Sequence, residues 1–151
     1  MDLRGAARVP WGILLLFGGG LSLAAALDGS GVAAYLGVLM SGLRGLPEIV
    51  VVAAVTTLVI FLTELTSNTA TAATLIPILA GIAPGLGLSP MVLAVPATLA
   101  ASCAFMMPVA TPPNAIVFGS GRITMRQMTR AGLGLNLAGI GIILLVTFAW
   151  L

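Results

Sequence analysis

The residues best suited to chemistry in this sequence are hydroxyl and amide side chains gathered in two short stretches. Thr63 to Thr71 holds a cluster of hydroxyls, one amide and the carboxylate of Glu64, and Ala110 to Asn114 repeats the pattern around two prolines. Carbonyl and hydroxyl oxygens suit a hard cation such as sodium. Free backbone N–H groups with Asn and Thr donors suit an anion, often a carboxylate. The chemistry indicated is therefore the binding of a cation and an anion.

The composition indicates that the solvent around this chain is a lipid bilayer. Of the 151 residues, 60% are hydrophobic and 7% are charged, and the mean hydropathy is +1.20. A soluble domain carries roughly a quarter charged residues. The absence of His and the single Cys exclude a disulfide within the chain, His-based metal sites and His general bases. With six basic against four acidic residues and no nucleophile–base, paired-carboxylate or phosphate-loop pattern, we expect neither an enzyme nor a nucleic-acid partner.

Apolar helices must position the two polar stretches. The first predicted helix lies before both stretches in the sequence. Trp11 to Leu27 is near the lower limit for spanning a bilayer. No Ala-x-Ala cleavage pattern follows it, so we predict a retained spanning helix rather than a signal peptide. Residues 30–44 are too short to span and suit the membrane interface. Residues 1–46 form one predicted part, on the scaffold side.

A re-entrant helical hairpin is predicted over residues 47–85. Its apolar arms, Ile49 to Leu62 and Ala70 to Ala83, are both shorter than the roughly 20 residues of a spanning helix, and they flank the polar tip. If the tip lies at mid-membrane, the first arm ends near Thr66 with unpaired carbonyls and the second begins near Asn68 with free N–H groups.

A proline-broken transmembrane helix is predicted over residues 90–119, with the break beginning at Met106. Three prolines in six residues cannot continue an α-helix, because proline has no amide donor. The break exposes carbonyls from Val109 to Thr111, and Pro112 and Pro113 suit the start of the next helix. A polar loop from Gly119 to Arg130 precedes the spanning part of a final helix at 124–151. Residues 47–151 form the predicted transport-domain part.

Simpler interpretations of these features stay open. The hairpin tip alone could be a polar surface loop, and a proline kink alone is often structural. Glu64, the one carboxylate expected inside the membrane, is either functional or a structural partner for an Arg or amide elsewhere in the protein. The arginines support the topology, because all of them except Arg44 fall on one side, which is cytoplasmic by the positive-inside rule.

Three segments resemble the divalent anion/sodium symporter family, whose members carry dicarboxylates, citrate or sulfate. They are Trp11 to Gly20, the Ser-Asn-Thr at 67–69 and the specific stretch Pro108 to Gly119. The family has two inverted repeats, each with a Ser-Asn-Thr hairpin and a broken helix. This chain has one copy of each motif and resembles the second, C-terminal repeat. The resemblance implies a fragment, a truncated gene or half of a split transporter.

The resemblance also implies the ligands. The sodium site would consist of Thr63, the Thr66 carbonyl, Asn68 and the Ala110 carbonyl. The substrate carboxylate would meet Asn68, Thr69 and the backbone of Thr111 and Pro112, with Ser67 as a weaker member of the same site.

The function expected from these features is sodium-coupled symport of a succinate-like or citrate-like carboxylate, or another divalent anion, by an elevator-like movement. No cofactor is expected beyond sodium as the coupling ion. The expected partners are the anion, sodium, the bilayer, the missing N-terminal repeat and, in the complete protein, a second copy in a homodimer. The expected location is the cell membrane as a multi-pass protein, in the inner membrane of a bacterium. The alternatives are proton-coupled uptake or anion exchange, with Glu64 as the titrating group, and a non-transporting subunit or remnant.

Overall fold

The computed structural model describes residues 45–150 without interruption and, before them, residues 14–15, 18–19, 22–23, 25–26, 29–39 and 42. Throughout this described part the regular elements are helices, as predicted. They are α3 (Val32–Leu39), α4 (Glu48–Thr63), α5 (Asn68–Ile82), the 3-10 turn η2 (Ala83–Leu86), α6 (Pro90–Ala100), α7 (Pro112–Gly119) and α8 (Met125–Trp150). The predicted spanning helix from Trp11 to Leu27 lies largely outside the described residues.

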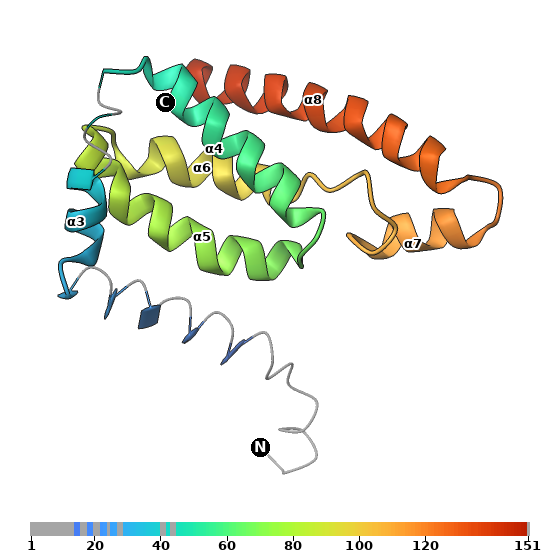
Figure 1. The fold of residues 1–151 in the computed structure, drawn as a ribbon, viewed down its shortest axis with the longest axis horizontal. Helices are drawn as coiled ribbons and strands as arrows, with labels where there is room; N and C mark the ends of the chain where they lie inside the picture. Colours follow the sequence, from blue (N-terminus) through green and yellow to red (C-terminus); the bar gives the residue numbers. More distant parts are fainter. Residues whose placement is uncertain are drawn as a thin grey trace, which may run out of the picture.

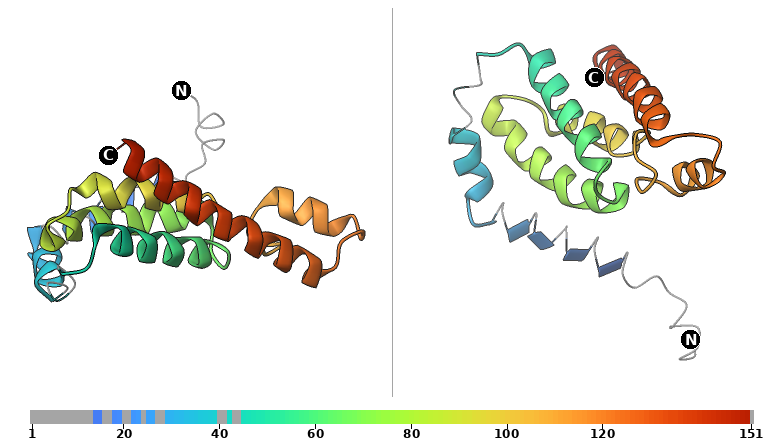
Figure 2. Two further views of the ribbon diagram at one scale, coloured as in Figure 1. Left: turned by 90° about the horizontal axis from the view of Figure 1, so that it is seen from above. Right: turned by 45° about the vertical axis from the view of Figure 1, so that its right-hand side comes forward.

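Helices α4, α5, α6 and α8 lie alongside one another, with α3 at one end and α7 at the other (Figure 1; Figure 2). Helix α6 is central, because it packs against α4, α5 and α8. Figure 1 also shows the tip between α4 and α5 part-way along α8, beside the irregular segment that follows α6. The two polar stretches are thereby brought to one place.

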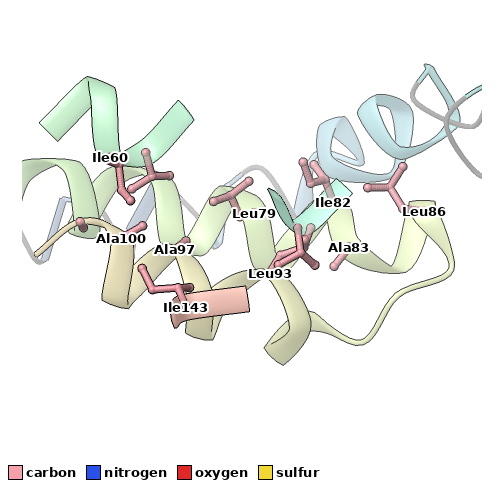
Figure 3. Packing of buried hydrophobic residues seen from close by; sticks show 12 residues of the cluster. Ile60, Leu79, Ile82, Ala83, Leu86, Leu93, Ala97, Ala100 and Ile143 are labelled. Atoms are coloured by element: carbon pink, nitrogen blue, oxygen red, sulfur yellow. The ribbon is translucent and has the colours of Figure 1, made fainter. Parts of the chain in front are cut away.

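The core joins these helices through narrow apolar stripes. On α6 the buried residues are Leu93, Pro96, Ala97 and Ala100, which share one face of a helix. Ile143 of α8 and Ile60 of α4 pack into the same cluster (Figure 3). Small residues on α6 allow neighbouring helices to approach closely, as is usual for helices in a membrane.

Two helices in the described part are long and apolar enough to cross a membrane. One is α8, with 26 residues, and the other is the 19-residue stretch Asn68–Leu86, formed by α5 and η2. The second hairpin arm is therefore longer than the predicted arm that ended at Ala83, and the prediction that both arms are shorter than a spanning helix is wrong for this arm. Gly87, with φ at 79°, ends it in the left-handed conformation that glycine adopts without strain.

The final helix begins inside the polar loop that was predicted up to Arg130, next to the predicted helix start at 124. Gln127 N donates to Thr124 Oγ1 at 3.3 Å and Thr124 N donates to Gln127 Oε1 at 2.9 Å. This reciprocal capping box starts α8 at Met125, one residue after the predicted start of the final helix at 124, and the polar loop predicted up to Arg130 is therefore shorter. Arg126 and Arg130 instead lie in the first turns of α8.

The break in the proline-rich helix is also longer than predicted. Helix α6 already ends at Ala100, before the predicted start of the break at Met106. Helix α7 begins at Pro112, one of the two prolines predicted to start it. Residues 101–111 thus form an irregular segment, called the break below, and side chains outside it hydrogen-bond to the backbone of residues 101 and 104–107.

Candidate functional site

The hairpin tip turns within the four residues between Thr63 and Asn68. Ser67 is extended, with φ −68° and ψ 132°, and its hydroxyl accepts from Ala70 N at 3.4 Å as the N-cap of α5. The first two N–H groups of α5, on Asn68 and Thr69, have no acceptor within the helix. They add to the positive end of the helix dipole and leave two donors at the tip.

Thr63 and Asn68 place two side-chain oxygens in contact. Thr63 is fully buried, and its Oγ1 lies 2.7 Å from Asn68 Oδ1 and 3.0 Å from the carbonyl oxygen of Ala101. A hydroxyl has one proton, so it can satisfy only one of these acceptors at a time. When the proton goes to Ala101, the Thr63 and Asn68 oxygens are left as a close pair of acceptors, which a cation can bridge.

Thr66 uses its side chain to close the tip and leaves its carbonyl unused. Its Oγ1 donates to the Leu62 carbonyl at 3.0 Å and lies 2.6 Å from Thr71 Oγ1. Because the Thr66 proton goes to Leu62, the buried hydroxyl of Thr71 is the donor in the second contact. Among the described residues the Thr66 carbonyl has no hydrogen-bond partner.

The far end of the break is held by the cap of α7. Thr111 Oγ1 accepts from Asn114 N at 3.3 Å, and Asn114 Nδ2 donates to the carbonyls of Ala104 at 2.9 Å and Met107 at 3.0 Å. Ala110 N donates to the same Met107 carbonyl at 3.2 Å. Within the described part of the chain, the Ala110 carbonyl and the Thr111 N–H have no partner.

The tip and the break face each other across a cleft of about 390 Å³. Its lining consists of Leu65, Thr66, Ser67, Asn68, Thr69, Val109, Ala110, Thr111 and Pro112. The cleft therefore brings together all the predicted site residues except Thr63. Thr63 does not line the cleft, but its hydroxyl contacts Asn68, which does. The lining has hydroxyls, an amide and free backbone groups, but no charged side chain. Pro112 contributes shape only, because it has no N–H to offer an anion.

Sequence reasoning did not identify the partners of Glu64. The carboxylate is 3% exposed, and it accepts hydrogen bonds from Phe105 N at 2.7 Å, Met106 N at 2.8 Å and Met107 N at 3.0 Å. A fourth comes from Asn136 Nδ2 at 2.8 Å. An amide is thus a partner of Glu64, but it lies within this chain, whereas the prediction placed it in another part of the protein. The sequence feature that could have pointed to Asn136 is a single amide side chain within an otherwise apolar predicted helix.

Comparison with known families shows to which family the chain belongs. Residues 5–151 match the family described as the sodium:sulfate symporter transmembrane region. The chain belongs to this family. The match supports the resemblance to divalent anion/sodium symporters.

The chain is similar to curated transporters from staphylococci. It is 47% identical over 148 residues to the sodium-dependent dicarboxylate transporter SdcS of Staphylococcus saprophyticus. It is 49% identical over 148 residues to the protein of the same name from Staphylococcus aureus strain USA300. Each alignment covers 98% of this chain and 28% of the relative, so the chain spans less than a third of the length of these relatives.

Proposed function

We propose that this chain is the second-repeat part of a membrane transporter that couples sodium to the uptake of a dicarboxylate, a tricarboxylate or another divalent anion. The observation that carries the proposal is the cleft, in which free carbonyls and free N–H groups of two helix breaks face each other. The printed names of the relatives, sodium-dependent dicarboxylate transporters, support a dicarboxylate as the first substrate to test.

The cation part of the cleft is the oxygen-rich side of the tip. We assign it to the side chains of Thr63 and Asn68 and to the carbonyls of Thr66 and Ala110. The 2.7 Å contact between the two side-chain oxygens supports this, because a shared cation would replace a shared proton. Neutral oxygens suit sodium, which needs hard ligands without a large fixed charge.

The anion part is the N–H-rich side of the tip. The N–H groups of Asn68, Thr69 and Thr111 and the Asn68 side-chain amide are the donors available to a carboxylate. Ser67 supports this side as the N-cap of α5, and its hydroxyl is a weaker direct ligand. Pro112 closes the cleft beside Thr111.

The lack of charge in the cleft gives a physical reason for coupling. A divalent anion entering it meets helix dipoles and amides but no Lys or Arg. A sodium ion on Asn68 would supply the missing positive charge a few ångströms away. By linkage, the anion must then raise the affinity for sodium as much as sodium raises the affinity for the anion.

The position of Asn136 supports a re-entrant hairpin with its tip at mid-depth. Asn136 lies near the middle of α8, roughly 16 Å from Met125 and 21 Å from Trp150 at 1.5 Å per residue. It is hydrogen-bonded to Glu64 at the tip. If α8 crosses the bilayer, the tip lies near the centre of the bilayer. The chain would then enter along α4 and return along α5 to the same side of the membrane.

The rest of the proposed assembly follows the family resemblance. A first repeat would supply the other half of the site, and the complete transporter would be a multi-pass homodimer in a bacterial inner membrane. The hairpin and broken helix would move together against a scaffold.

A chimera tests the proposed function. This chain replaces the matching 148-residue region of the S. aureus transporter, and succinate uptake into proteoliposomes is measured with a sodium gradient or with choline instead. Uptake that requires sodium supports the proposal. Equal uptake in choline, driven by a proton gradient or by internal succinate, would favour the proton-coupled or exchange alternative. A well-folded chimera without uptake would favour a non-transporting chain.

A further inference from the structure

Glu64 is a buried carboxylate outside the cleft that the proposed ligand sites do not use. Its four hydrogen-bond partners are the N–H groups of Phe105, Met106 and Met107 and the side-chain amide of Asn136. All of them are donors, and an ionised carboxylate is a pure acceptor with about four lone-pair positions. The surroundings therefore fit a carboxylate that accepts hydrogen bonds from the backbone of a neighbouring segment.

The N–H groups that Glu64 binds belong to the break. Because α6 ends at Ala100 and α7 begins at Pro112, these N–H groups have no helical acceptor. Irregular backbone at membrane depth is tolerated only where the protein or water satisfies it. Glu64 does this for three consecutive residues of the break.

Helix α8 packs closely against the break. A Cβ added to Gly132 would overlap the carbonyl group of Phe105 and lie 2.6 Å from the Cα of Met106. Only glycine lets the two backbones come this close. Asn136, one turn further along the same face of α8, donates to Glu64 at 2.8 Å.

Met107 connects this arrangement to the cleft. Its N–H donates to Glu64 Oε2 at 3.0 Å, and its carbonyl accepts from Ala110 N at 3.2 Å and from Asn114 Nδ2 at 3.0 Å. Ala110 lines the cleft and carries one of the free carbonyls. A displacement of Met107 would therefore displace a proposed sodium ligand.

We propose that Glu64, Asn136 and Gly132 form a brace, the Glu64 brace, which fixes the break so that the carbonyl of Ala110 faces the hairpin tip. The three are positioning residues for the cation part of the cleft. The claim that the brace affects sodium binding rests on the proposed function. The claim that the brace fixes residues 101–111 does not.

Hydrogen–deuterium exchange of the full chain in lipid nanodiscs tests the brace. The brace variants are Glu64→Gln, Asn136→Ala and Gly132→Ala. The matched controls are Glu48→Gln, an exposed carboxylate, and Gly134→Ala, where an added Cβ meets open space. Exchange is followed by mass spectrometry for peptides over residues 101–111 and 63–69, in choline chloride and over a sodium chloride titration.

In choline, each brace variant should speed exchange at 101–111 by about tenfold or more, while both controls keep the wild-type rate. In sodium chloride, the sodium concentration that half-protects residues 63–69 should rise about tenfold in the brace variants.

Exchange at the wild-type rate over 101–111 in Glu64→Gln or in Gly132→Ala would contradict the brace, and so would faster exchange spread evenly over α4, α6 and α8. If Glu64→Gln does not fold, the comparison of exchange at 101–111 in Gly132→Ala and in its control Gly134→Ala tests the brace. If sodium protects nothing at 63–69 in the wild type, the proposed function fails for this chain, and the choline comparison still decides the brace.

Discussion

Asn68 combines two ligand roles in a single side chain. Its carbonyl oxygen is 2.7 Å from Thr63 Oγ1 and so belongs to the cation part of the cleft. Its amide NH₂ and its backbone N–H are donors on the anion side. Thr69, the next residue, lies entirely on the anion side, because its N–H is free and its hydroxyl has no partner among the described residues.

Thr69→Ala should therefore separate the two ligands. Removing its hydroxyl takes one donor from the anion and no oxygen from the cation, so the apparent affinity for succinate should fall several-fold while that for sodium changes less. The measurement is succinate uptake by the chimera over a grid of succinate and sodium concentrations. An equal loss for both ligands would contradict the division of the cleft.

Glu64→Gln distinguishes the brace from proton coupling in the same assay. The glutamine amide has one acceptor oxygen and cannot accept from Met107 N through its nitrogen, so the break should loosen. We expect about tenfold more sodium for half-maximal uptake, with an unchanged shape of the pH profile. Asn136→Ala, which removes no titratable group, should raise the sodium requirement in the same way as Glu64→Gln. A flattened pH profile with normal sodium affinity in Glu64→Gln alone would identify Glu64 as a proton carrier.

At the scale of the elements, local chemistry was readable from the sequence and long-range contacts were not. Polar residues after an apolar run predicted the tip, and paired prolines predicted the start of α7 at Pro112. The hydrogen-bond partner of the break could not be predicted, because Glu64 is 41 residues or more away in sequence from the N–H groups it binds. The closeness of Gly132 to Phe105 is likewise a property of how α8 packs. The final helix was predicted to start at 124, and the capping box between Thr124 and Gln127 gives the physical reason for the observed start at Met125.

The depth of the tip is a prediction about an element, and single cysteines test it. On a Cys103→Ala background, which removes the one native cysteine, cysteines at positions 67, 68 and 69 should react slowly with membrane-impermeant maleimides. A cysteine at Glu48, on the outer end of α4, should react rapidly from the extracytoplasmic side only. Labelling of 67–69 at the rate of position 48 would place the tip in a surface loop and contradict the re-entrant hairpin.

At the scale of the whole molecule, much of the apolar surface is uncovered by the described part of the chain. Helix α7 has no buried residue, and Ile116, Val117 and Phe118 are all exposed. On α8 the buried residues fall on one narrow stripe from Met128 to Thr147. Lipid suits such surfaces, and so does a further repeat of the same transporter, since the chain spans 28% of the length of its relatives.

We therefore expect this chain to be inactive when reconstituted by itself. It has one Ser-Asn-Thr tip and one Thr-Pro-Pro-Asn break, and the family resemblance implies two of each around a complete site. Liposomes with the purified chain should show no sodium-driven succinate uptake above liposomes without protein. Uptake by the chain alone would mean that two copies assemble as an inverted pair, which the one-sided arginines disfavour.

The central claim is that the hairpin tip binds both ligands, and Asn68→Ala tests it most directly. Leaving a buried partner unpaired costs about 1–3 kcal/mol, and about 1.4 kcal/mol corresponds to a tenfold change in affinity. Succinate uptake by the chimera, titrated with sodium and with succinate, should therefore show at least about a tenfold loss of apparent affinity for both in Asn68→Ala. Cys103→Ala, in the break but outside the cleft lining, should stay near wild type. Wild-type dependence on both sodium and succinate in Asn68→Ala would contradict the account, because the site would then lie elsewhere.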